Sequence, residues 1–274
     1  MNTSGPPTEY VLARRVLLDA LDALGANRDA VVLVGAQAVY FHTGNTDLAV
    51  APTTTDADIA LAPDRLHDEP LLKEALRSAG FTAGSSPGMW CGARGVAVDL
   101  MVPEALSGSR GRRGARLPVH GNRVARRTTG LEPALVDNEP HKVTSLDSSD
   151  DRSHAIRVAG PAALLVAKLI KVEERSGQPL RLQPKDGLDV LRLLQACETL
   201  PLTNRLASLA EDPLAGDVTR MALSSLAAHG RDRDGPLARL AAQAVAGLAD
   251  PETTIESLVA LVDDLLVCYQ QVHR

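Results

Sequence analysis

Apolar residues recur in the first part of the chain as short runs that alternate with helical segments. Residues 9–24 repeat apolar positions at helical spacing and stop at Gly25, a common end for a helix. The β-branched run 31–34 is typical of a strand buried on both faces, and Gly35 separates it from a helical segment at 36–41. The same reasoning predicts strands at 53–61, 96–102 and 156–158, a helix at 66–79, and a hairpin within 81–95.

The pattern becomes helical throughout after Gly160. Pro161 suits the first turn of a helix, and Asp-Pro or glycine interrupts the later segments. Helices are predicted at 162–175, 185–197, 202–210, 214–228, 236–248 and 252–271. We therefore predict an α+β fold, with a mixed sheet flanked by helices over residues 1–158 and a C-terminal helical bundle over 159–274.

Two acids stand inside an apolar strand pattern. Asp56 and Asp58 are two residues apart, so they share a face of the strand 53–61. Adjacent carboxylates repel one another unless a cation or a proton neutralises them. Asp99 lies within the next long apolar strand, and if the two strands are neighbours the three carboxylates converge. Three oxygen donors on rigid strands suit Mg²⁺.

The charge of the chain is concentrated in one segment. A net charge of -5 gives no global reason to expect a polyanionic partner. However, residues 108–130 contain no acid and seven arginines: Arg110, Arg112, Arg113, Arg116, Arg123, Arg126 and Arg127. We expect an exposed loop that either binds phosphate groups or is simply a solvated surface. Aromatic residues make up only 2% of the chain, so base stacking is not the main means of contact.

The cysteines and the hydropathy indicate a compartment. Cys91, Cys197 and Cys268 are far apart and show no metal-ligand spacing, as expected for reduced thiols. No basic-then-apolar signal peptide opens the sequence, and no apolar run approaches the ~20 residues of a membrane span. We expect a cytoplasmic protein that has no membrane partner.

Several short motifs occur in a fixed order. They are Val34-Gly35-Ala36-Gln37-Ala38, the triplet Thr54, Asp56 and Asp58, the acid Asp99, the helix 161–169 with Lys168 inside it, and Lys185-Asp186-Gly187-Leu188-Asp189-Val190. In this order they resemble a nucleotidyltransferase of the polymerase-β superfamily. The resemblance is greatest to the AbiEii-type (MenT-like) toxins of bacterial toxin-antitoxin systems.

The resemblance implies a nucleotidyltransferase-like sheet and an enzyme that moves a nucleoside monophosphate from a nucleoside triphosphate to an acceptor, releasing pyrophosphate. Asp56, Asp58 and Asp99 would bind Mg²⁺, and Asp99 is alternatively the base for the acceptor hydroxyl. Lys168 would neutralise charge on the triphosphate, with Asp186 orienting it or the incoming base. The remaining nucleotide contacts would be Gly35, Ala36, Thr54, Thr55, Lys185 and Asp189. The acceptor would be the 3′ end of a tRNA, bound by Arg112, Arg113, Arg116, Arg123 and Arg126, and the partner a cognate antitoxin protein.

Each of these features also has a structural interpretation. Acids on a strand can mark a solvated face, and a lysine such as Lys168 can extend from the flank of a helix to water. Asp186 and Asp189 lie where an acid stabilises the helix dipole, so only one of them need be catalytic. Two further functions stay open: a small-molecule nucleotidyltransferase of the aminoglycoside-modifying kind, and a silent nucleotide- or protein-binding module, for which Ala36 at the turn is the main indication.

Overall fold

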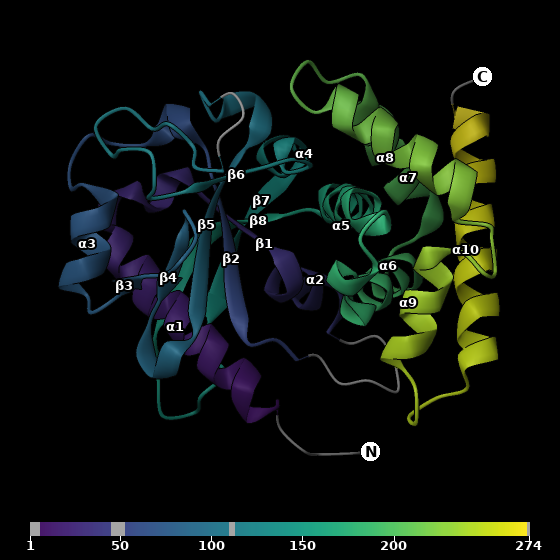
Figure 1. Ribbon diagram of the computed structural model, residues 1–274, viewed down its shortest axis with the longest axis horizontal. Coiled ribbons are helices and arrows are strands. Elements are labelled where there is room, and N and C mark those ends of the chain that lie inside the picture. The colour runs from purple at the N-terminus through teal and green to yellow at the C-terminus, as the bar shows by residue number, and fades with distance from the viewer. Residues whose placement is uncertain (1–5, 45–52, 110–112, 273–274) are drawn as a thin grey trace. The chain divides into compact units, whose positions relative to one another are not determined.

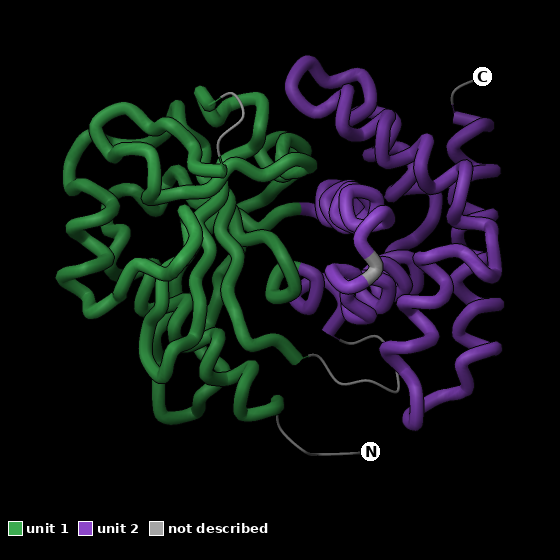
Figure 2. The backbone as a smooth tube through the Cα atoms, viewed as in Figure 1, with its two compact units in different colours: residues 1–38, 51–159 green, residues 39–50, 160–274 purple. Residues whose placement is uncertain are grey.

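The computed structural model describes residues 6–44, 53–109 and 113–272 of the chain. These residues fall into two compact units (Figure 2). The first comprises the described parts of 1–38 and 51–159, and the second those of 39–50 and 160–274. A sheet forms the centre of the first unit, whereas the described part of the second is helical (Figure 1).

The first unit contains eight strands and their covering helices. Its strands are β1 (Val31–Val34), β2 (Asp56–Leu61), β3 (Thr82–Ala83), β4 (Met89–Cys91), β5 (Ala97–Pro103), β6 (Arg126–Thr128), β7 (Asn138–Thr144) and β8 (Ser153–Ala159). Its helices are α1 (Thr8–Leu24), α2 (Gly35–Thr43), which continues into the second unit, α3 (Leu72–Ser78) and α4 (Glu132–Val136). Short 3₁₀ turns occur at Gly25–Ala30, Pro63–Arg65, Ala93–Gly95 and Glu104–Leu106.

The sheet is mixed and has the strand order β3-β4-β5-β2-β1-β8-β7, with β6 paired to β5. The pairs β1–β8, β2–β5 and β5–β6 are parallel, and the other four are antiparallel. The helix α1 packs on β2 and β5. Ala57, Ile59, Val98 and Leu100 on these two strands are fully buried. The alternate positions of the two strands, which include the three acids, lie on the opposite face.

The described part of the second unit contains six further helices. They are α5 (Pro161–Ser176), α6 (Pro184–Ala196), α7 (Thr199–Ala210), α8 (Gly216–His229), α9 (Pro236–Ala244) and α10 (Pro251–Val272), with a 3₁₀ turn at Pro179–Arg181. Buried leucines on each of these helices form the core. Gly187 lets α6 and α9 approach closely, since a Cβ there would lie 2.6 Å from the backbone nitrogen of Ala241. The glycine of the Lys185–Val190 motif therefore has a packing role.

The predicted fold class, a mixed sheet flanked by helices and followed by C-terminal helices, is confirmed. Two predicted elements differ. The helix expected at 66–79 begins only at Leu72, because Pro70 disfavours helical backbone in the residue before it. The strand β7 was not predicted, since its residues do not alternate between apolar and polar and include Pro140, which is tolerated at this sheet edge.

The arginine-rich segment also differs from the exposed loop that its composition predicts. Ala115, Leu117, Val124 and Ala125 are buried, and the segment ends in the strand β6. The seven arginines dominate the composition of the segment, so the few small and apolar residues between them gave no signal of burial. None of the helices in the described ranges combines the length and apolarity that a membrane span requires.

A buried arginine connects the elements around the acidic strand. Arg14 on α1 is 4% exposed and donates through Nε to Gln37 Oε1 (2.8 Å), and through Nη1 to the carbonyl of Thr144 (2.9 Å). Gln37 in turn donates through Nε2 to the backbone oxygen of Asp56 (3.0 Å). This relay fixes the start of β2, where the first acid lies.

Replacing Arg14 by methionine should therefore destabilise the first unit. Arg14→Met leaves the buried Gln37 oxygen without its donor, which costs about 1–3 kcal/mol. The neighbouring Arg15 is exposed, so Arg15→Met is a matched control that should change stability by less than about 0.5 kcal/mol. Urea unfolding of the two variants measures the difference, and equal stabilities would contradict the structural role of Arg14.

Candidate active site

The two acid-bearing strands lie side by side. In the parallel pair β2–β5, Asp58 is opposite Asp99 and Asp56 is opposite Ala97. Residues opposite each other, and residues two apart, project from the same face. All three acids are partly exposed, while the residues between them are buried. The three carboxylates therefore share one face of the sheet at its centre.

Two of these carboxylates have identified partners. Thr54 is buried and donates its hydroxyl to Asp56 Oδ1 at 2.6 Å. The guanidinium of Arg126 forms an ion pair with Asp99, with 3.0 Å between Nη2 and Oδ2. Burial raises the pKa of Asp99, and the negative charge of Asp56 raises it further, against the opposing effect of Arg126. Asp99 is therefore a stronger base than an ordinary aspartate.

Gly35 determines how closely Asp58 can approach the start of α2. The backbone of Gly35 has φ +67°, in the left-handed region that favours glycine. A Cβ at this position would lie 2.0 Å from Asp58 Oδ2 and 2.7 Å from Asp58 Cβ. The carboxylate thus packs against a backbone that only glycine provides. Ala36 follows in the helix and is buried.

The donor set has the chemistry that Mg²⁺ prefers, namely carboxylate oxygens on rigid strands. Yet across the described ranges no three acidic, histidine or cysteine side chains converge closely enough to bind an ion. One oxygen of Asp99 is held by Arg126, and one of Asp56 by Thr54. The residues fit the ion by type and by face of the sheet, and in this conformation two of them are occupied by protein groups.

A second group of charged residues is buried in the helical unit. Lys168 on α5 is 5% exposed, and its Nζ lies 2.6 Å from Asp189 Oδ2 and 3.2 Å from Asp186 Oδ1. Both acids are on α6 and are almost fully buried. Lys171 and Arg175, one and two turns further along α5, approach Asp186 at 2.8 and 3.6 Å. The sequence-predicted Lys168, Asp186 and Asp189 are thus in direct contact.

Basic residues determine the charge state of Asp186 in this cluster. Burial raises the pKa of Asp186, but Lys168 and Lys171 outweigh burial and leave the pKa below its usual value. Arg192 is 1% exposed, lies over the ring of Tyr40 and interacts with Asp189. The cations that are almost fully buried, Lys168 and Arg192, lie beside the two buried acids, whereas Lys171 and Arg175 reach solvent.

The arginines of residues 108–130 divide into two kinds. Arg113, Arg116 and Arg123 are exposed, line one hollow of about 1110 Å³, and form no ion pair with any described residue. By contrast, Arg126 is paired with Asp99, and Arg127 with Glu104 at 3.4 Å. The predicted RNA contact Arg112, like Arg110, lies outside the described residues. Of the other predicted nucleotide contacts, Thr55 is exposed just before β2, and Lys185 is half-buried in the first turn of α6.

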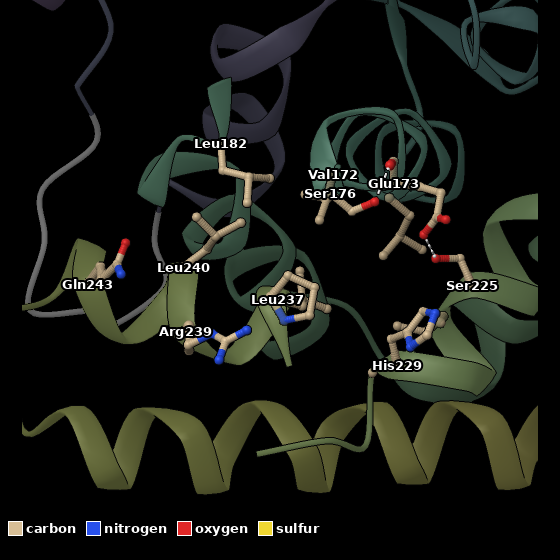
Figure 3. A pocket seen from close by; sticks show the side chains of 14 residues that line it. Val172, Glu173, Ser176, Leu182, Ser225, His229, Leu237, Arg239, Leu240 and Gln243 are labelled. Atoms are coloured by element: carbon tan, nitrogen blue, oxygen red, sulfur yellow. Dashed lines mark hydrogen bonds between the residues drawn. The ribbon is translucent and has the colours of Figure 1, made fainter. Parts of the chain in front are cut away.

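Another cavity, of about 600 Å³, lies within the helical unit between α5, α8 and α9 (Figure 3). Leucines from these helices, among them Leu169, Leu226 and Leu237, form much of its wall. At one side Ser225 donates its hydroxyl to Glu173 at 2.5 Å. None of the predicted site residues lines this cavity.

Sequence reasoning missed several residues of these clusters. Lys171 and Arg175 follow Lys168 at helical spacings of three and seven, so the period itself could have identified them. Gln37 belongs to the motif at residues 34–38, but nothing in the sequence indicates its hydrogen bond to the backbone oxygen of Asp56. The pairing of Arg126 with Asp99 depends on the strand β6, which the sequence pattern does not predict.

The comparisons with known proteins identify the family. A family model described as nucleotidyltransferase matches residues 14–209, a range that contains both charged clusters. No curated protein matches the sequence. A crystal structure of a candidate nucleotidyltransferase from H. pylori aligns over 98% of this chain and 99% of that one, at 9% identity and a TM-score of 0.39, too low to support any argument. The family match alone spans most of the chain, and the protein therefore belongs to the nucleotidyltransferase family.

Proposed function

We propose that this nucleotidyltransferase uses Mg²⁺ to transfer a nucleoside monophosphate from a nucleoside triphosphate to the 3′ end of a tRNA, and that it acts as a toxin paired with an antitoxin. The observation that carries the metal-dependent chemistry is the parallel register that sets Asp58 beside Asp99, with Asp56 on the same face. The tRNA acceptor, the toxin role and the antitoxin rest on the resemblance to the AbiEii-type enzymes.

In the proposed mechanism Asp56 and Asp58 would hold the metal, and Asp99 would be either a further ligand or the base. When bound, Mg²⁺ supplies neutralisation of the charge that develops on the phosphates. The acceptor hydroxyl oxygen forms a bond to the α-phosphorus while the bond to pyrophosphate breaks. If Asp99 is the base, the hydroxyl proton passes to its carboxylate, whose pKa burial has raised.

The proposed nucleotide contacts are those that the resemblance implies. Gly35 and Ala36 open the nine-residue helix α2, and N–H groups at a helix start favour phosphate. Thr54 and Thr55 precede the acidic strand, and Thr54 orients Asp56. On the helical unit, Lys168 neutralises the triphosphate, while Asp186 and Asp189 hold its ammonium group in place. Lys185 adds a cation in the same first turn of α6.

The hollow lined by Arg113, Arg116 and Arg123 supports an anionic acceptor. Three exposed guanidiniums around one concavity suit the phosphates of an RNA backbone. An aminoglycoside is itself cationic and calls for acidic residues, which this hollow lacks. The hollow belongs to the segment that ends in β6, and β6 pairs with the Asp99 strand. An RNA bound there would therefore reach the same sheet as the acids.

Removing the Asp58 carboxylate, or displacing it, should abolish transfer while the protein stays folded. We expect Asp58→Asn to lower the rate more than about 100-fold, beyond the loss typical of an outer-sphere partner. Gly35→Ala should have a similar effect, because its Cβ would displace Asp58. Gly80→Ala is the matched control: Gly80 has φ +85° but nothing within 4 Å of its Cβ. Both alanines should cost about 1–2 kcal/mol of stability from the left-handed backbone, and only Gly35→Ala should lose activity. If Asp58→Asn and Gly35→Ala were as active as Gly80→Ala, the role of Asp58 would be refuted.

Lys168→Met tests the second cluster, and the variant should lose both stability and nucleotide affinity. Removing Lys168 leaves Asp189 without its 2.6 Å donor in a buried site, at a cost of about 3–5 kcal/mol. Lys171→Met is the control, since Lys171 also bonds Asp186 but is partly exposed. Nucleoside triphosphate affinity is measured at a temperature where both variants are folded. If the folded Lys168→Met protein binds the nucleotide like wild type, Lys168 is purely structural.

Charge reversal in the hollow should reduce RNA labelling selectively. With Arg113, Arg116 and Arg123 changed to glutamate, transfer of label from triphosphates to bulk cellular RNA should fall steeply at moderate salt. In the wild type the logarithmic salt slope of RNA binding should be about 0.7 per phosphate contact. The control reverses Arg65, Arg77 and Arg94, which are exposed outside the hollow. If neither salt nor the mutations change the labelling of RNA, the hollow is not the acceptor site. If the wild type labels no RNA at all, a small-molecule acceptor is favoured.

A further inference from the structure

Arg126 occupies an unusual position between the acidic strand and the basic hollow. Its strand pairs with β5, where Met101 is its partner in the register. The terminal Nη2 lies 3.0 Å from Asp99 Oδ2 and 3.1 Å from the Met101 sulfur. Its Nε is buried and has no hydrogen-bond acceptor in the described part of the protein. The guanidinium is therefore incompletely satisfied, and Asp99 is the one acid among the described residues with which it is paired.

This ion pair can be exchanged at low cost. The side chains of Arg126 and Asp99 are 37% and 26% exposed, and ion pairs that reach solvent contribute little to stability. A divalent ion that ligates Asp99 competes with Arg126 for the same carboxylate, and two cations at one carboxylate repel each other. Without either cation, Asp99 faces the negative charge of Asp56 unneutralised. We therefore expect the Asp99 carboxylate to be neutralised by either Arg126 or the divalent ion, and not by both at once.

The backbone around Arg126 pairs with residues 113–116, a segment that contributes to the wall of the basic hollow. Gly114 forms a bridge with Arg126, and the N–H of Arg127 donates to the carbonyl of Arg113 at 2.8 Å. The N–H of Ala115 donates to the carbonyl of Ala125 at 3.0 Å. The strand of Arg126 is thus paired with the segment that carries Arg113 and Arg116, two of the arginines that line the hollow.

We propose that Arg126 is a positioning residue that neutralises Asp99 in the metal-free enzyme, yields Asp99 to Mg²⁺, and then turns its guanidinium to a phosphate of the acceptor. The inference rests on the proposed function, since it assumes that the three acids bind the metal. It makes metal binding and acceptor binding mutually dependent. By linkage, the factor by which the metal strengthens acceptor binding equals the factor by which the acceptor strengthens metal binding.

Calorimetric titration of the full-length protein with Mg²⁺ alone tests the exchange, without any reaction. Arg126→Gln should bind Mg²⁺ about five- to tenfold more tightly than wild type, because the competing charge is gone. Arg127→Gln is the matched control: it lies next in the same strand and is paired with Glu104 instead of Asp99, so its affinity should not change. Thermal unfolding shows whether each variant is folded, and Arg126→Met, which keeps the apolar stem, serves if the glutamine variant is not.

A second measurement follows the other half of the exchange. Binding of a short oligouridylate to wild type should strengthen about fivefold when Mg²⁺ is added, and this gain should vanish in Arg126→Gln. Arg127→Gln should keep the gain. A gain that survives in Arg126→Gln would mean that the guanidinium does not carry the coupling.

The outcomes separate this inference from the proposed function. If Asp58→Asn abolishes Mg²⁺ binding but Arg126→Gln leaves the affinity unchanged or weakens it, the metal site stands and the exchange is wrong. Weaker binding would mean instead that Arg126 orients Asp99 as a ligand. If no variant binds Mg²⁺, or if binding survives Asp58→Asn, the metal site itself is wrong and the exchange fails with it.

Discussion

The repulsion among three carboxylates on one face of a sheet is the constraint to which the surroundings of the site respond. The negative charge of Asp56 disfavours the charged form of Asp99, and together with burial it raises the pKa of Asp99 against the opposing effect of Arg126. Two interactions stabilise the charged carboxylates: the hydroxyl of Thr54 donates a hydrogen bond to Asp56, and the guanidinium of Arg126 forms an ion pair with Asp99. The arrangement is costly for a merely structural face and suits a site that binds a cation.

The helical unit has the opposite constraint, a positively charged side chain in its interior. Lys168 is almost fully buried, and such a lysine needs anionic partners, which Asp186 and Asp189 provide. Lys171 and Arg175 share Asp186 with Lys168, and both of their side chains reach solvent, so their added charge costs little.

The sequence predicted the architecture where its pattern was periodic and failed where contacts were long-range. The continuous run 31–34 and the alternating acids of β2 are local signals, and both became strands of the central sheet. The six C-terminal helices follow from helical spacing and their breaks. By contrast, β7 and β6 are strands because of their partners β8 and β5, and nothing in their own residues indicates it. The division of the arginines into paired and exposed ones follows from those same partners.

The predicted site shows the same limit at the level of single residues. The register of β2 with β5 decides that Asp58, and not Asp56, stands beside Asp99, and no local pattern contains that information. The contacts of Lys168 with Asp186 and Asp189 join helices that are separated in sequence by the 3₁₀ turn at Pro179–Arg181. Residue type and order therefore identified the acids and the lysine, whereas their partners required the fold.

The turn before α2 explains how an alanine can follow the glycine of this site. The position that needs a left-handed backbone and close approach to Asp58 is Gly35, with φ +67°. Ala36 is not among the residues with positive φ; it is buried within the helix, where alanine is the most favourable residue. Glycine at 36 would add conformational freedom that the fold does not use. Ala36, the main indication of a silent module, thus falls at a position where backbone freedom is not required, and membership of the nucleotidyltransferase family agrees with an active enzyme.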